Sequence, residues 1–231
     1  MKLKFLTIKK NTLYIILLCL ILIFSMVGVC YAVKSTSSPK GQYCVVIDAG
    51  HGGRDGGAVG TSTGITESEL NLKYALQLQS LCEDFDIEVV MTRSSMNGLY
   101  DENASNKKKS EMEKRKKIIN ESNADLMISI HMNSFPLPSL QGAYVFYAKG
   151  SDKGFELAKS VQNALCLSFE TARKSVSVGD YFVLNYSNIP AILIECGFLS
   201  NPQEEIKLQN NEYCKNFCYS VLAGIISYFK M

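Results

Sequence analysis

The sequence has 231 residues, of which 47% are hydrophobic, and a formal net charge of +2 at pH 7. This apolar content is that of a globular chain that can bury a core, which excludes a chain disordered throughout. The length suits one domain of ordinary size preceded by a targeting segment.

The N-terminus predicts a signal or transmembrane segment at residues 1–33. Four lysines, at positions 2, 4, 9 and 10, precede an uncharged run over residues 13–33. About 20 apolar residues can cross a bilayer as a helix, and the lysines orient the N-terminus toward the cytoplasm. We expect the rest of the chain to be exported, either anchored in the membrane or secreted to its outer face. The length of the run favours an anchor, whereas the small residues around Tyr31 permit cleavage after Ala32.

Residues 34–42, KSTSSPKGQ, are polar and contain Pro and Gly, which predicts a linker to a domain at residues 43–231. Six of the eight cysteines follow this linker, and they lie mostly within apolar stretches, as buried thiols do. We therefore expect most of the six to be free, although exported proteins often form disulfides. Cys214 and Cys218 have no second cysteine pair with which to complete a zinc cluster.

Apolar runs of strand length alternate with helix-length segments through the domain. The predicted strands are residues 44–48, 87–92, 126–130, 143–147, 181–184 and 191–195. The predicted helices are residues 67–83, 107–122, 153–168 and 212–229. The continuous runs CVVI, LMISI and AILI indicate strands buried on both faces. This alternation predicts an α/β domain with helices layered on a sheet.

The basic stretch KKKSEMEKRKK, residues 107–117, is most simply a solvated helix face. Met112 and Ile119, two turns apart, are expected to hold its inner side. Attraction to an anionic wall polymer or membrane surface is the alternative. We do not expect a nucleic-acid partner for an exported protein.

The chain has only two histidines, and each directly follows a predicted buried strand: His51 follows CVVIDAG, and His131 follows LMISI. Ligands of open α/β sheets bind at the carboxyl ends of strands, so both histidines are expected at one edge of the sheet. Histidine is a common metal ligand. The pair therefore predicts a shared metal.

Six glycines surround His51 in the stretch IDAGHGGRDGGAVG. Such a run contributes no packing and costs backbone entropy, so the backbone must turn sharply or approach a neighbour closely. We expect it to turn His51 toward the metal and to leave room for a bulky substrate. A nucleotide-binding G-x-G-x-x-G loop does not fit, because Asp55 stands where the third glycine belongs, and no P-loop lysine follows.

A catalytic zinc needs a third protein ligand and an open position. In GITESEL, residues 64–70, Thr66 and Glu69 fit a capping box at the start of a helix, which accounts for Glu69. Glu67 has no such structural task. It is either the third ligand or a residue that only complements the helix dipole, and spacing alone leaves both interpretations open.

Glu195 ends the very apolar strand in IPAILIECGFLSNP. An ionised carboxylate is costly there unless it is paired or functional. At the carboxyl end of its strand it would face the same crevice, where glutamate is the usual general base of zinc hydrolysis. The alternative is a salt bridge to a lysine or arginine.

Four ordered stretches together resemble the zinc-dependent N-acetylmuramoyl-L-alanine amidases of the Amidase_3 type. They are IDAGHGGRDGGAVG, GITESELNL, RKKIINESNADLMISIHMNS and IPAILIECGFLSNPQEE. The resemblance covers nearly the whole domain, residues 43–229. It implies that His51, Glu67 and His131 bind one Zn²⁺ per chain and that Glu195 is catalytic. It also implies a twisted, mixed six-stranded sheet flanked by helices.

The reaction implied by this resemblance is hydrolysis of the amide between N-acetylmuramic acid and L-alanine in peptidoglycan. Zinc would acidify a water and polarise the carbonyl, while Glu195 takes a proton from the water and returns one to the leaving amine. The implied partners are peptidoglycan glycan strands with stem peptides, and family precedent leaves room for an activating protein.

The chain departs from the family pattern at two positions. Ala49 stands where proline is common, and Asn185 stands where many members have arginine, which leaves open what holds the substrate carboxylates. Arg115 does match a family arginine, and we expect a structural role for it. The compact layout resembles the germination-specific amidases of endospore formers, the CwlD type. These remove stem peptides so that muramic-δ-lactam can form in the spore cortex, which would place the domain in the forespore or cortex space.

Two rival functions remain. A zinc-dependent peptidoglycan peptidase or carboxypeptidase can use a similar site of two histidines and a glutamate, but it would cut within the stem peptide. A non-catalytic wall-binding regulator should lack a ligand or the base, whereas this sequence has all four candidates.

Overall fold

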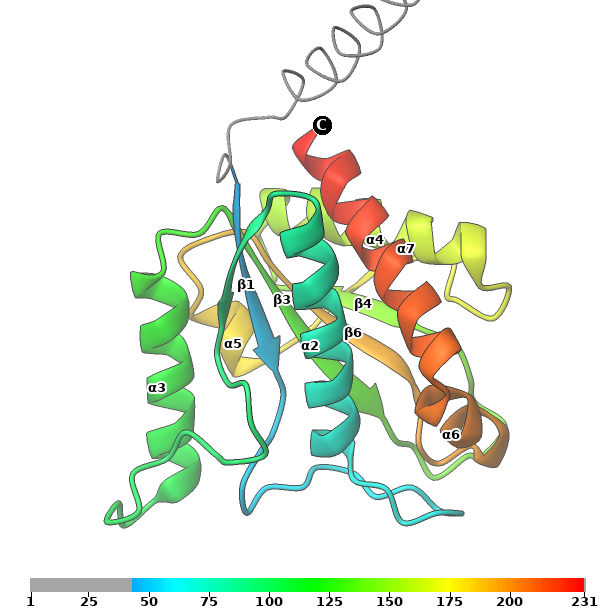
Figure 1. The fold of residues 1–231 in the computed structure, drawn as a ribbon, viewed down its shortest axis with the longest axis horizontal. Helices are drawn as coiled ribbons and strands as arrows, with labels where there is room; N and C mark the ends of the chain where they lie inside the picture. Colours follow the sequence, from blue (N-terminus) through cyan, green and yellow to red (C-terminus); the bar gives the residue numbers. More distant parts are fainter. Residues whose placement is uncertain (1–42, 231) are drawn as a thin grey trace, which may run out of the picture. The chain divides into compact units, whose positions relative to one another are not determined.

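A six-stranded sheet with strand order β2-β1-β3-β6-β4-β5 forms the centre of residues 43–230, which the computed structural model describes (Figure 1). Its strands are β1 (Cys44–Ala49), β2 (Glu88–Met91), β3 (Leu126–Asn133), β4 (Tyr144–Tyr147), β5 (Ser177–Val178) and β6 (Ala191–Phe198). The helices are α2 (Glu67–Asp84), α3 (Lys107–Glu121), α4 (Asp152–Ser168), α5 (Phe182–Asn185), α6 (Pro202–Gln209) and α7 (Asn211–Phe229).

The sheet is mixed, as the resemblance implied. Strand β1 runs parallel to β2 and β3, and β3 runs parallel to β6, whereas β4 is antiparallel to β6. The carboxyl ends of β1, β3 and β6 therefore meet at one edge, the lower edge in Figure 1. Parallel neighbours need crossover connections, and α2 and α3 supply them for β1, β2 and β3.

Both faces of the sheet are buried, as the continuous apolar runs predicted. Val45 and Ile47 of β1 belong to a large core that also contains buried residues of α2, α4 and α7. Val46, between them, points to the opposite face and joins a smaller core with Ile119 of α3 and Val183 of α5. Alternate residues of one strand thus contribute to two cores.

Polar caps determine where the helices begin. Helix α2 starts with the predicted capping box of Thr66 and Glu69. The side chains of Asn106, Ser151 and Asn210 accept hydrogen bonds from backbone N–H groups in the first turns of α3, α4 and α7, groups that would otherwise lack partners.

The prediction of a strand at residues 181–184 is wrong. These residues, YFVL, have strand-forming side chains, but 182–185 form the short helix α5. Val183 and Leu184 of α5 are buried in the smaller core, so tertiary packing outweighs local strand propensity. The edge position of the sheet is filled by the two-residue strand β5, which was not predicted, and α6 was also missed.

The inner side of α3 differs in part from the prediction. Ile119 is buried, as expected, but Met112 is only partly buried. The fully buried positions one and two turns before Ile119 are polar: Arg115 and Glu111. The six cysteines of the described residues are all free, as predicted.

The predicted signal or transmembrane segment (1–33) and linker (34–42) lie outside the described residues. From residue 43 to residue 230, no helix is both long and apolar enough to cross a membrane.

Candidate active site

The four candidate residues come together at the carboxyl edge of the sheet. His51 lies two residues beyond β1, and Glu67 is the first residue of α2. His131 and Glu195 stand side by side in register on the parallel strands β3 and β6. Both strands continue past these residues, to Asn133 and Phe198, so neither residue ends its strand as the sequence suggested.

Two histidine nitrogens converge on one carboxylate oxygen. The Nε2 of His51 lies 3.1 Å from Oε1 of Glu67, and the Nδ1 of His131 lies 2.8 Å from the same oxygen. One potential ligand atom from each of the three residues lies within 4.8 Å of the others. Two imidazole nitrogens and a carboxylate oxygen are a donor set that suits zinc. The three residues thus fit a metal ion with room for a further ligand.

The backbone around His51 explains the glycines. His51 itself has φ = 59°, a left-handed conformation that is rare outside glycine. A Cβ at Gly50 would lie 2.3 Å from ring atoms of His131, and one at Gly57 would lie 2.4 Å from Oε2 of Glu67. A side chain at either position would therefore clash with a candidate ligand, His131 or Glu67.

Glu67 faces the site rather than only the helix dipole. It is 5% exposed, and its Oε2 accepts a hydrogen bond from the backbone N–H of Ala58. Burial works against ionisation, but the contacts with His131 and His51 lower the pKa of Glu67 well below its usual range. The carboxylate is thus held ionised, as a metal ligand must be.

Asp55 is a neighbour of the site that the sequence reasoning did not single out. Its Oδ1 lies 2.9 Å from Nδ1 of His51, although the atoms are not aligned for a hydrogen bond, and its other oxygen pairs with Lys108. Burial alone would lower the pKa of His51, but Glu67 and Asp55 raise it. The sequence feature that could have indicated Asp55 is its place four positions after His51, inside the glycine-rich stretch.

Glu195 is buried at the same edge, and no residue in 43–230 pairs with it. It is 8% exposed, and its Oε2 makes no hydrogen bond within the described residues. The alternative of a salt bridge to a lysine or arginine does not hold within residues 43–230, where Glu195 forms no ion pair. Burial, assisted by the negative charge of Glu67, raises the pKa of Glu195 to about 7. Such a carboxyl can exchange a proton near neutral pH.

A small cleft of about 100 Å³ opens beside both histidines. Its walls include Lys108 and Met112 of α3 and Tyr181 and Phe182 at the start of α5. Burial, with the charges of Glu195 and Glu67, raises the pKa of Tyr181 to about 12, so its phenol stays protonated and able to donate. Sequence reasoning missed Tyr181 and Lys108, because it placed their segments in a strand and on a solvated face.

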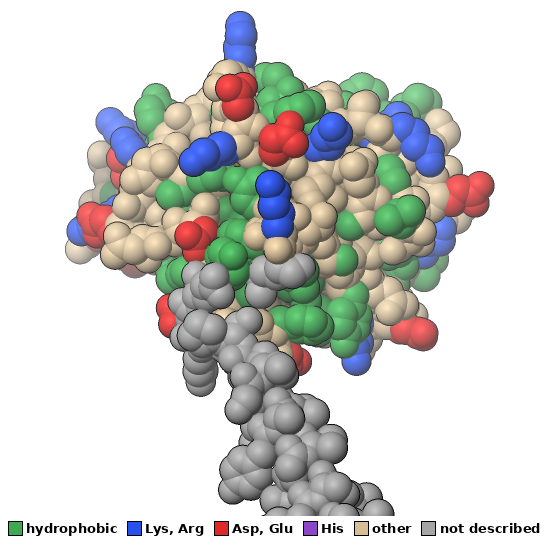
Figure 2. Space-filling model, turned by 90° about the horizontal axis from the view of Figure 1, so that it is seen from above, with side chains coloured by type: hydrophobic (Ala, Val, Ile, Leu, Met, Phe, Trp, Pro, Cys, Tyr) green, Lys and Arg blue, Asp and Glu red, His purple; other side chains and the backbone are tan. Residues whose placement is uncertain are grey.

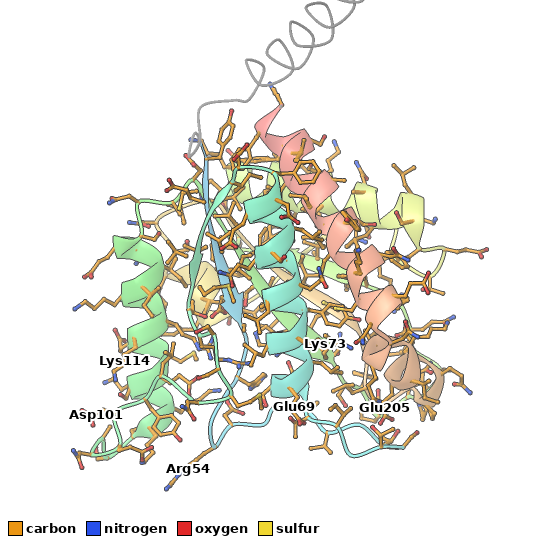
Figure 3. All side chains as sticks on the ribbon, in the orientation of Figure 1. Arg54, Glu69, Lys73, Asp101, Lys114 and Glu205 are labelled. Carbon is orange, nitrogen blue, oxygen red and sulfur yellow. The ribbon has the colours of Figure 1, made fainter. Side chains whose placement is uncertain are left out.

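The opposite end of the domain offers no comparable arrangement of histidines. Figure 2 shows that end from above, with acidic and basic side chains interspersed and no histidine among the described side chains in view. In Figure 3 the labelled Glu69, at the start of α2, and Glu205, on α6, lie at the end that holds the site.

Comparisons with known proteins show what the chain is similar to. Residues 45–227 match the family model described as N-acetylmuramoyl-L-alanine amidase, Amidase_3. The germination-specific N-acetylmuramoyl-L-alanine amidase of Bacillus subtilis is 34% identical over 200 residues, which cover 85% of this chain and 84% of that protein.

Solved structures give the same result. The CwlD amidase of Clostridioides difficile, solved in complex with the GerS lipoprotein, has a TM-score of 0.78 at 33% identity and covers 82% of this chain and 99% of that one. An N-acetylmuramoyl-L-alanine amidase from Clostridium difficile has a TM-score of 0.74 at 31% identity and covers 83% of this chain and 98% of that one.

Proposed function

This chain belongs to the Amidase_3 family of N-acetylmuramoyl-L-alanine amidases, and from that premise we propose that it is a zinc enzyme of spore peptidoglycan. It is an amidase acting on the bond between N-acetylmuramic acid and L-alanine. In our proposal His51, Glu67 and His131 hold one Zn²⁺, and Glu195 is the catalytic base and acid.

The observation that carries the metal site is the convergence of His51 Nε2 and His131 Nδ1 on Oε1 of Glu67. This set of two imidazole nitrogens and a carboxylate oxygen suits a catalytic zinc, because three protein ligands leave a coordination position for substrate or water.

A bound zinc would supply Lewis-acid chemistry, by acidifying water and polarising the amide carbonyl. Glu195 would accept a proton from the attacking water and deliver it to the amine nitrogen of L-alanine as the amide C–N bond breaks. Its carboxyl is buried without a partner among residues 43–230 and has a pKa of about 7, which suits both halves of that transfer. The charge of Asp55, whose Oδ1 lies 2.9 Å from the His51 nitrogen that faces away from Glu67, would favour a proton on that nitrogen and leave the other nitrogen free to bind the metal.

Two substitutions test these assignments. His131→Ala should abolish stoichiometric zinc, measured by metal analysis of the purified protein. Glu195→Gln should keep the zinc and lose hydrolysis of peptidoglycan, whereas Glu170→Gln, which changes an exposed carboxylate, should keep both. Full activity of Glu195→Gln would remove Glu195 from the mechanism, and unchanged zinc in His131→Ala would remove the metal site.

The germination role is supported by the similarity to the germination-specific amidase of Bacillus subtilis. We expect the chain to remove stem peptides so that muramic-δ-lactam can form in the cortex. Expression in a Bacillus subtilis strain lacking its germination-specific amidase should restore muramic-δ-lactam to the spores. Spores without the lactam, from cells in which the expressed chain still cleaves vegetative wall, would indicate a general wall amidase instead.

A protein partner and an extracytoplasmic location complete the proposal. The related CwlD amidase was solved with a lipoprotein, which favours a membrane-attached activator for this chain as well. Residues 1–33 would direct residues 43–231 across the membrane. Fractionation of cells expressing the full chain should place it at the outer face, protease-accessible, and recovery only from the cytosol would contradict this.

A further inference from the structure

Two arginines are buried beneath the candidate site. Arg93 follows β2 and is 4% exposed, and Arg115 lies on α3 and is 1% exposed. Burying a guanidinium costs free energy unless its N–H groups have hydrogen-bond acceptors. The acceptors of Arg93 and Arg115 therefore indicate what these side chains do in the fold.

The two side chains bind three consecutive carbonyl oxygens around His51. Arg93 donates through Nε to Ala49 O at 2.9 Å and through Nη2 to Gly50 O at 2.8 Å. Arg115 donates through Nη1 to Ala49 O at 2.8 Å and through Nη2 to His51 O. The backbone that presents His51 is thus held at the carbonyls of Ala49, Gly50 and His51.

The turn needs such support, because its backbone is strained. His51 has φ = 59°, a left-handed conformation that is strained for a residue with a side chain. Such a conformation persists only where surrounding contacts hold it. The carbonyls of Gly50 and His51 point toward the arginines and not into the sheet ladder. Asn71 also donates to Gly50 O. The N–H groups of Gly50, Gly52 and Gly53 donate to other backbone carbonyls, but among the described residues only the two arginines and Asn71 bind the carbonyls of Gly50 and His51.

Arg93 also ties the His51 turn to the start of α2. Its Nη2 donates to Ser68 O at 2.9 Å, one residue after Glu67. Within the described residues its acceptors are all backbone carbonyls, the fourth being Ser95 O, and it forms no ion pair. Arg115, by contrast, is also paired with the carboxylates of Asp48 and Glu111. Charge pairing explains the burial of Arg115 in part, but it does not explain that of Arg93.

We propose that Arg93 and Arg115 are positioning residues that set the geometry of the zinc site before the metal arrives. They fix His51 in its left-handed conformation, and Arg93 fixes the distance between the backbone segments that carry His51 and Glu67. The inference rests on the proposed zinc site, and it assigns the task of preorganising that site to two residues that are not among its proposed ligands.

The first test is the zinc affinity of Arg93→Lys, measured by competition with a chromogenic chelator. Lysine keeps the charge but lacks the guanidinium fork with which Arg93 reaches four carbonyl oxygens at once. Loss of such outer support weakens metal binding about 10- to 100-fold. Arg115→Lys should do the same. Ile119→Ala is the matched control, because it removes buried volume from α3 one turn beyond Arg115 without touching the His51 turn. It should lower the unfolding temperature and leave the zinc affinity of the folded protein unchanged.

A spectroscopic readout separates positioning from stability. Co²⁺ in the wild-type protein should give the intense visible bands of a four-coordinate site, and Arg93→Lys should weaken or shift them. Zinc affinity within twofold of wild type in both lysine variants would overturn the proposal. Equal weakening in Ile119→Ala would also overturn it, because general destabilisation would then be the cause.

Hydrogen exchange of the zinc-free wild-type protein gives a test that requires no variant. If the turn is preorganised, the amides of Gly50, Gly52 and Gly53, which donate to Ile130 O, Asp55 O and Met96 O, are protected before zinc is added. Amides that exchange freely without zinc and become protected only with it would contradict preorganisation. A wild-type protein that binds no zinc would instead contradict the proposed metal site itself, so the two failures are distinguishable.

Discussion

Replacing Glu195 by glutamine is expected to stabilise the zinc-free protein at alkaline pH and to change its stability little in acid. Burial raises the pKa of this carboxyl from 4.5 to about 7, so the folded state favours the neutral acid. The stability that the protonated Glu195 contributes is fully present below pH 4.5 and is lost as the pH rises through 7. Glutamine has nearly the same shape and never ionises.

The magnitude follows from the two pKa values. Each unit of pKa corresponds to about 1.4 kcal/mol, so the rise from 4.5 to about 7 amounts to roughly 3 kcal/mol in the free energy of unfolding. For a domain of this size, that difference corresponds to an increase of roughly 6–12 °C in the unfolding temperature. Glu195→Gln should therefore match wild type near pH 4.5 and exceed it by this amount above pH 8.

Thermal unfolding, followed by circular dichroism in the presence of a chelator from pH 4.5 to 8.5, measures this difference. Glu170→Gln is the control, because its exposed carboxylate keeps its hydration on folding, and its curve should follow wild type. A constant difference between Glu195→Gln and wild type across the pH range would refute the reasoning. It would mean that the ionised carboxylate of Glu195 is stabilised by an interaction absent from the described residues, so that its pKa is not raised.

Two further predictions concern the loops of the site. Gly50→Ala should displace the ring of His131, 2.3 Å from the new Cβ, and lower zinc affinity at least tenfold by chelator competition, whereas Gly56→Ala, whose nearest contact is 3.5 Å, should bind zinc as wild type does; equal affinities would contradict the steric argument. Glu205→Gln should destabilise the protein by about 1–3 kcal/mol and speed hydrogen exchange at Ser62 and Thr63, because Glu205 accepts the backbone N–H groups of both residues at 2.7 Å. Unchanged exchange there would show that the loop is held by other contacts.

The parts of the fold that could be predicted are those where the local pattern and the tertiary environment agree. The runs around Val46, Ile128 and Leu193 are apolar on both faces, and all three are buried in the central strands. The prediction of a strand at residues 181–184 failed because this strand-like sequence forms a short helix that packs against the smaller core. Strand β5 has only two residues, too short for any periodic pattern.

Some residues of the candidate site could likewise be predicted from the sequence, and others could not. His51, His131 and Glu195 could be found because a polar residue that follows a run of buried apolar residues is costly there unless it is paired or functional. Glu67 required the family resemblance, because its partners come from distant parts of the chain. Arg93 could not be found, since the acceptors that explain its burial are backbone carbonyls, which leave no trace in a side-chain pattern.

The measurement that tests the central claim most directly is product analysis by mass spectrometry, with the full chain and zinc acting on purified peptidoglycan. The account predicts released peptides that begin with L-alanine and carry a free amine, together with glycan strands whose lactyl groups are intact. Fragments cut within the stem peptide, with the bond between muramic acid and L-alanine preserved, would contradict it and identify a peptidase built on the same residues.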